Sequence, residues 1–112
     1  MSDIYEAIKS GNLDQVKTII NQDGFDVNQP QKYGETPLYI ACRWGHLHVV
    51  NVLLSIDGID INQAKNRGYT PLKIACMNGN KEIVEALLNS IEKKKENLND
   101  YNIGDIIKSL DK

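Results

Sequence analysis

The chain has 112 residues, the size of one ordinary domain, and its 13 basic and 15 acidic residues give a net charge of −2. This balance gives no electrostatic reason to bind nucleic acid or an anionic membrane, and no apolar stretch approaches the roughly 20 residues that span a bilayer. Because Asp3 and Glu6 stand where a signal peptide needs basic residues before an apolar run, we expect an intracellular protein, cytoplasmic, nuclear or both.

The first predicted unit covers residues 2–21 and is related to the residues after it by a step of 34, which for example places Ala7 on Ala41. Gln15 and Thr18 are polar where the equivalent positions of the later units are apolar. In a stack of repeats the two ends face solvent and must be polar outside. We therefore interpret the first unit as an N-terminal cap.

The second predicted unit contains two helices joined by a tight turn. Thr36 precedes Pro37, the preferred first helical residue, and a Thr there can cap the backbone amides of a helix running to about Arg43. Gly45 permits the left-handed turn that ends this helix. A second helix over roughly 46–55 has apolar residues at helical spacing, and an Asp-Gly pair then opens an extended loop.

The third predicted unit starts again at Thr70-Pro71-Leu72, and its second helix begins near Lys81. No Asp-Gly pair follows that helix, so we expect it to run on through Lys93-Lys94-Lys95. Residues 101–107 fall in register with the opening of another unit. We expect one short capping helix there.

Two segments resemble the ankyrin-repeat signature, namely Gly34-Glu35-Thr36-Pro37-Leu38-Tyr39-Ile40-Ala41 and Gly68-Tyr69-Thr70-Pro71-Leu72-Lys73-Ile74-Ala75. The resemblance covers about residues 2–90 and implies an all-α fold, a solenoid of stacked helix-turn-helix units with projecting β-turn loops. The family's usual His after Thr-Pro-Leu is Tyr39 in one repeat and Lys73 in the next. The loop between repeats is one residue longer than the commonest family pattern.

The expected organisation is one ankyrin-repeat domain over residues 1–112. It comprises an N-terminal capping repeat (1–32), two full repeats (33–66 and 67–100) and a degenerate C-terminal capping helix (101–112).

Residues that could carry chemistry have simpler structural explanations. Cys42, His46 and His48 could suggest a metal site, but Gly45 breaks the helix between the first two, and residues two apart on a helix diverge. A small buried Cys and a structural His are the better interpretation. No phosphate-binding loop, nucleophile elbow or Cys-His pair with an orienting acid is present. We expect no metal, no cofactor and no enzymatic activity.

The basic run 93–95 could be a nuclear-import or phosphate-binding segment, but flanking glutamates favour a solvated helix end.

A candidate binding surface emerges from positions that differ between the two full repeats while the scaffold positions agree. The resemblance implies that partners lie against the loop tips and the first helices, which is where these positions fall. Trp, Tyr and Arg are enriched in binding hot spots, and Met adapts to irregular surfaces. The candidate contact residues are Tyr33, Glu35, Arg43, Trp44, Asn66, Arg67, Tyr69, Met77 and Asn78.

Within this set we expect Trp44 to be exposed and central, since its counterparts Asn78 and Ser10 are small and polar, unlike core residues. Arg43, Tyr69 and Met77 are expected to flank it. Tyr39 and Lys73 either extend the rim or only fill the position of the missing His.

The sequence therefore predicts a protein-binding adaptor or inhibitor, monomeric when free, whose ligand is a helix, loop or peptide of another protein. The alternative is a structural subunit or self-associating scaffold within a larger complex.

Overall fold

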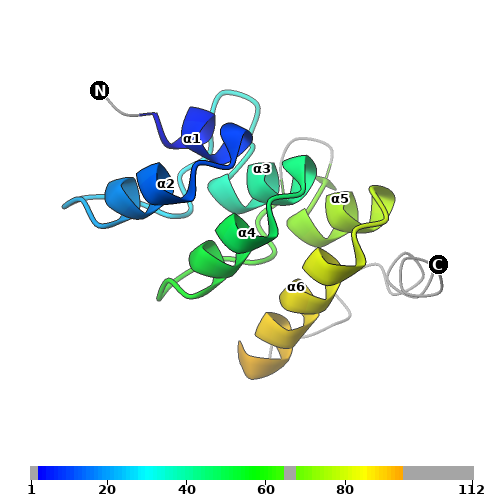
Figure 1. The fold of residues 1–112 in the computed structure, drawn as a ribbon. Helices are drawn as coiled ribbons and strands as arrows, with labels where there is room; N and C mark the ends of the chain where they lie inside the picture. Colours follow the sequence, from blue (N-terminus) through cyan, green and yellow to red (C-terminus); the bar gives the residue numbers. More distant parts are fainter. Residues whose placement is uncertain (1–2, 65–67, 95–112) are drawn as a thin grey trace.

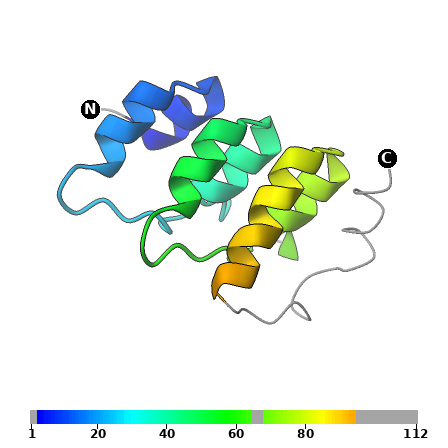
Figure 2. The same ribbon diagram turned by 60° about the horizontal axis from the view of Figure 1, so that its bottom comes forward.

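Stacked helical hairpins form the fold, as the resemblance predicted (Figure 1). The computed structural model describes residues 3–64 and 68–94, in which the regular elements are six α-helices. One layer contains α1 (Ile4–Ser10), α3 (Pro37–Trp44) and α5 (Pro71–Met77); the other contains α2 (Leu13–Ile20), α4 (Leu47–Leu54) and α6 (Lys81–Lys94) (Figure 2). Within each layer the middle helix packs against both of its neighbours.

The helices begin and end at residues that favour helix capping. Thr36 Oγ1 accepts a hydrogen bond of 3.2 Å from the Tyr39 amide at the start of α3, and Thr70 Oγ1 accepts one of 3.1 Å from the Lys73 amide at the start of α5. Gly45 ends α3 with φ of 74°, a left-handed conformation that glycine adopts without steric cost.

The core repeats with the same step of 34 as the sequence. Small alanines let the first helices pack closely, and valines and larger aliphatic side chains fill the space between the layers. Equivalent buried residues are Ala7, Ala41 and Ala75 in the first helices and Val16, Val50 and Val84 in the second helices. At the N-terminal end Gln15 and Thr18 are exposed, as expected of a capping unit.

The side chain of Asn28 joins two successive interhelical loops. Its Nδ2 donates to the Gly58 carbonyl at 2.8 Å, and its Oδ1 accepts from the Asp60 amide at 2.8 Å. These bonds connect residues 30 and 32 positions apart in sequence, so they belong to the stacking of repeats and not to either repeat alone.

The last described helix is longer than its counterparts. α6 has 14 residues, whereas α2 and α4 have 8 each, and Ile91 in its added turns is buried. The predicted continuation of the helix is confirmed as far as Lys94. Lys95 and the predicted capping helix over 101–112 lie outside the described residues, and the proposed repeat boundaries stay predictions.

Candidate protein-binding face

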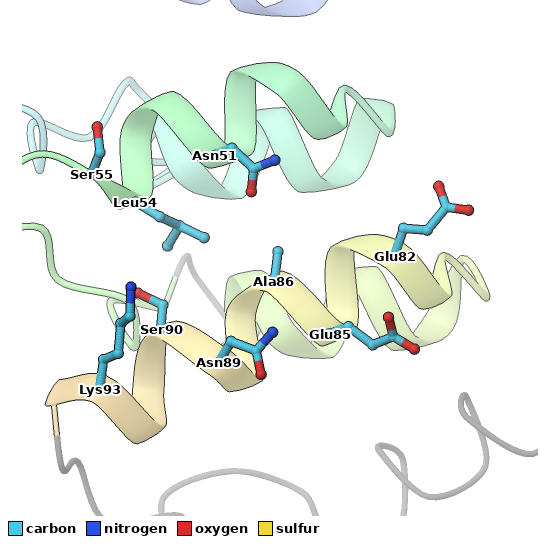
Figure 3. A pocket seen from close by; sticks show the side chains of 9 residues that line it. All are labelled: Asn51, Leu54, Ser55, Glu82, Glu85, Ala86, Asn89, Ser90 and Lys93. Atoms are coloured by element: carbon cyan, nitrogen blue, oxygen red, sulfur yellow. The ribbon is translucent and has the colours of Figure 1, made fainter.

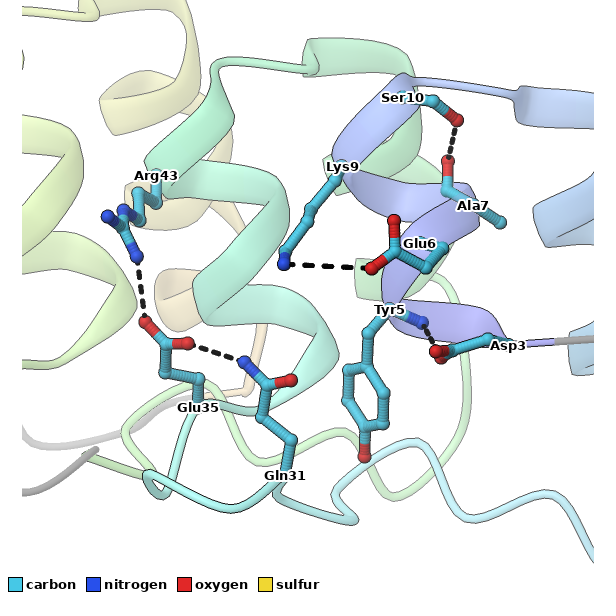
Figure 4. Close-up of polar contacts among 9 residues, drawn as sticks. All are labelled: Asp3, Tyr5, Glu6, Ala7, Lys9, Ser10, Gln31, Glu35 and Arg43. Carbon is cyan, nitrogen blue, oxygen red and sulfur yellow. Dashed lines mark hydrogen bonds and ion pairs between the residues drawn. The ribbon is translucent and has the colours of Figure 1, made fainter.

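The candidate contact residues that the structure describes lie in α3 and α5, in the turns, residues 31–35 and 68–70, that precede these helices, and at the C-cap of α5. They share the layer formed by α1, α3 and α5. We call this surface the inner face. Figure 4 shows part of it, with polar side chains of α1, α3 and the first turn on the same side of the molecule.

Trp44 is half exposed, as predicted, with 50% of its surface accessible. It is the last residue of α3, beyond the stripe of buried residues that faces the core. Tyr33 and Met77 are exposed by 59% and 56%, and these three are the exposed large hydrophobic residues of the described part of the chain. All three lie in α3, α5 or the turn before α3, so the apolar exposure is concentrated on the inner face.

Glu35 was one of the candidate contact residues, but it is buried, with only 6% of its surface accessible, so its choice as a surface contact is wrong. The turn closes through backbone hydrogen bonds between Gln31 and Gly34 and between Gln31 and Glu35, which folds this carboxylate inward. Gln31 Nε2 donates to one of its oxygens, and Arg43 Nη1 donates to the other at 3.2 Å (Figure 4). Glu35 therefore positions Arg43 from beneath the surface.

Arg43 connects this buried carboxylate to the exposed tryptophan. Its side chain is half exposed, and its guanidinium carbon lies 5.7 Å from the centroid of the Trp44 ring. At this distance the positive charge is attracted to the face of the indole. The backbone of Arg43 is also held in place. Asn78, which follows α5, donates a hydrogen bond of 3.0 Å from its Nδ2 to the Arg43 carbonyl.

Two further aromatic residues of this face are each covered by a lysine. Lys32 Nζ lies 5.5 Å from the centroid of Tyr33, and Lys73 Nζ lies 5.1 Å from the centroid of Tyr69. Both aromatics lie at turns before the helices, while Trp44 and Met77 end them. The structure thus places Arg43 beside Trp44 and places Tyr33 and Tyr69 toward the other end of the helices. The expectation that Tyr69 flanks Trp44 is therefore wrong.

Tyr39 fills a core position and does not extend the rim, since only 2% of its surface is accessible. Burial, followed by the nearby carboxylate of Glu35, raises the pKa of its hydroxyl above 10.0. Lys73, its counterpart, is partly exposed over Tyr69. Asn66 and Arg67, the remaining candidates, lie outside the described residues.

His46 is used to join repeats. Its Nε2 lies 2.8 Å from the Lys9 carbonyl, and its ring packs so closely on Gly11 that a Cβ there would approach it to 2.9 Å. Cys42 and Cys76 are buried free thiols, and burial raises the pKa of Cys42. Across the part of the chain that the structure describes, no three His, Cys, Asp or Glu side chains could together hold a metal ion.

A groove of about 430 Å³ between α4 and α6 was not foreseen from the sequence (Figure 3). Asn51 and Leu54 of α4 line one side, and Glu82, Glu85 and Lys93 of α6 line the other. It is an open groove on the outer layer, and polar and apolar surface contribute about equally to its walls. The sequence feature that could have predicted this groove is the absence of an Asp-Gly pair after α6. Without that pair the helix continues for extra turns, and Lys93 in these turns lines the groove together with Leu54.

Comparison with known proteins agrees with the geometry. The family model described as ankyrin repeats (3 copies) matches residues 4–100, which include all six helices, whereas no curated protein matches the chain. Within residues 3–64 and 68–94 no helix combines the length and apolar character needed to cross a membrane. Ankyrin repeats are generally protein–protein interaction modules and typically have no enzymatic activity. The match over most of the chain, together with the stacked helical hairpins, shows that this protein belongs to the ankyrin-repeat family.

Proposed function

We propose that this protein binds a partner protein on its inner face, as an adaptor or an inhibitor. The observation that carries the proposal is the position of the exposed hydrophobic residues of the described chain. Tyr33, Trp44 and Met77 all lie on the inner face, and none of them lines the outer groove. Exposed apolar patches rimmed by polar groups are typical of interaction sites.

Trp44 is the proposed anchor because its indole is large, half exposed and held beside Arg43. A partner side chain that packs on the indole would bury apolar area without requiring much reordering of either residue. Truncation of such an anchor typically weakens binding by about 2 kcal/mol or more, about thirtyfold.

The test compares Trp44→Ala with His48→Ala, a truncation of an exposed ring on the outer helix α4. Each variant is used to capture partners from the native cell, and affinity for the captured protein is then measured with purified components. We expect Trp44→Ala to weaken binding about thirtyfold and His48→Ala to leave it unchanged. Equal binding by wild type and a folded Trp44→Ala variant would refute the anchor.

Self-association is the alternative use of the same surface. Light scattering over a range of protein concentrations separates the two, since we propose a free monomer. A mass that rises with concentration, and falls back in Trp44→Ala, would assign the inner face to contacts between copies of this chain.

The rest of the proposal follows from the sequence: a protein of the cytoplasm, the nucleus or both, which needs no cofactor and binds neither nucleic acid nor membranes. Its ligand is a helix, loop or peptide that fits a short strip of three first helices.

A further inference from the structure

The central part of the inner face is basic although the chain as a whole is acidic. Residues 31–44 and 68–78, which form α3, α5 and the turns before them, contain three cations, Lys32, Arg43 and Lys73, and a single carboxylate, Glu35. That carboxylate is buried and faces Arg43. The whole chain has a net charge of −2, so the charge is distributed unevenly.

The acidic residues lie mostly elsewhere. The loops that follow α2 and α4 carry four exposed aspartates, and the outer helix α6 carries exposed glutamates at 82, 85 and 92. On α1 the exposed Glu6 is paired with Lys9 at 3.8 Å. The glutamates of α6 are balanced by Lys81, Lys93 and Lys94, so the outer layer carries no net charge. An acidic ligand is therefore repelled by the loops and attracted to the part of the inner face formed by α3 and α5.

Each of the three cations lies over an aromatic ring of the same surface, at 5.1 to 5.7 Å from its centroid. Lys32 and Lys73 form no salt bridge with any carboxylate of the described residues. Their ammonium groups are therefore available to a ligand, next to apolar ring surface. A ligand that matches this arrangement needs carboxylates and a large apolar side chain close together.

We propose that the ligand of the inner face is an acidic segment of a protein, in which Asp or Glu residues flank at least one large apolar residue. This inference rests on the proposed function and names the chemistry of its partner. The apolar residue packs on Trp44, a neighbouring carboxylate pairs with Arg43, and a second carboxylate farther along the segment pairs with Lys73. A peptide fits better than a nucleic acid, because three cations beside a buried carboxylate do not form the continuous basic surface that a phosphate backbone requires.

Selection from a random peptide library on the full chain provides the probe. We expect the enriched peptides to be rich in Asp and Glu around one or two aromatic or aliphatic residues. The consensus peptide is then measured by calorimetry at low and high salt, and we expect weaker binding at high salt because exposed charge pairs are screened.

The decisive variant is Lys73→Glu, which the fold should tolerate. Lys73 is the third residue of α5 after the capping Thr70, the position at which a Glu completes a capping box. Loss of one attraction and gain of one repulsion should weaken the consensus peptide about tenfold. Lys17→Glu, the same charge change on the outer helix α2, is the matched control and should change affinity less than about twofold.

The outcomes distinguish this inference from the proposed function. Neutral or basic peptides that still require Trp44 would overturn the acidic ligand and leave the binding face in place. Peptides indifferent to both Trp44 and Lys73, or no enrichment at all, would overturn both. A single-stranded oligothymidylate that binds as tightly as the consensus peptide and competes with it would assign the cations to nucleic acid instead.

Discussion

Asn28 and Asn62 occupy the same position in successive repeats, yet alanine at the first should destabilise the protein far more than alanine at the second. Asn28 makes two hydrogen bonds to the next loop, to the Gly58 carbonyl and the Asp60 amide, each 2.8 Å long. A hydrogen bond contributes about 0.5–1.5 kcal/mol net, so Asn28→Ala should lower the free energy of unfolding by about 2 kcal/mol.

In the described part of the chain, Asn62 has no equivalent loop of a following repeat to which its side chain could bond. The residues 34 positions after Gly58 and Asp60 are Glu92 and Lys94, and both belong to α6. Within the described residues the Oδ1 of Asn62 is buried and has no hydrogen-bond partner. An unsatisfied buried oxygen is unfavourable by about 1–3 kcal/mol, so its absence in Asn62→Ala offsets the loss of side-chain packing. We expect a change within about 0.5 kcal/mol of zero.

Urea unfolding followed by far-ultraviolet circular dichroism measures both changes. The two sites are matched, because alanine keeps the backbone amide and that amide makes the same kind of turn at each position. The Asn28 amide donates to Asp26 at 2.9 Å, and the Asn62 amide donates to Asp60 at 3.1 Å. Any difference therefore comes from the side chains. Equal losses of stability in the two variants would refute the argument that Asn28 joins the repeats.

Two further predictions concern the packing between helices. Gly11→Ala should destabilise the protein by about 1 kcal/mol more than Gly24→Ala in urea melts. Both glycines have left-handed φ, but only the Cβ at Gly11 displaces the His46 ring and its hydrogen bond. Equal losses of stability would contradict this prediction. The buried Cys42 thiol has a raised pKa, so above pH 9.0 the unfolded state loses a proton that the folded state keeps. Stability should fall with rising pH there, by up to about 1.4 kcal/mol per unit, and less steeply in Cys42→Ala; parallel pH profiles would contradict the prediction.

The helices could be predicted from the sequence because their ends depend on neighbouring residues. A Thr before a Pro, and a Gly after the last buried residue, act within a single turn of helix and recur with the step of 34. The exposure of Trp44 also followed from comparison of the repeats, since its counterparts are polar. These signals are local or periodic, and both kinds are visible in one sequence.

The burial of Glu35 could not be deduced in that way. Positions that differ between the two full repeats were interpreted as exposed. At Glu35, however, the difference arises because this repeat contains an ion pair that the next repeat does not have. Glu35 and Arg43 become Tyr69 and Met77 together in the next repeat. That joint change, eight residues apart, was the available signal. The bridging by Asn28 and the groove beside α6 depend on contacts between repeats, which a periodic pattern does not specify.

The ion pair between Glu35 and Arg43 suggests a last test, because the next repeat has the uncharged residues Tyr69 and Met77 at the equivalent positions. Arg43→Met removes the ion pair to the buried Glu35 and should destabilise the protein by about 2 kcal/mol, less than for a fully buried pair because Arg43 is half exposed. Glu35→Tyr should be less harmful, at about 1 kcal/mol, since the guanidinium can reach water.

The double variant restores the combination found at Tyr69 and Met77, so it should lose about 1 kcal/mol less than the sum of the single changes in urea melts. Strictly additive losses would mean that other contacts, and not Arg43, keep Glu35 buried. The same double variant removes one of the three cations over the aromatic rings while the core and caps stay intact. It should therefore remain folded, because the periodic residues stabilise the stack, and bind an acidic ligand more weakly, because the Arg43 charge at the binding face is lost.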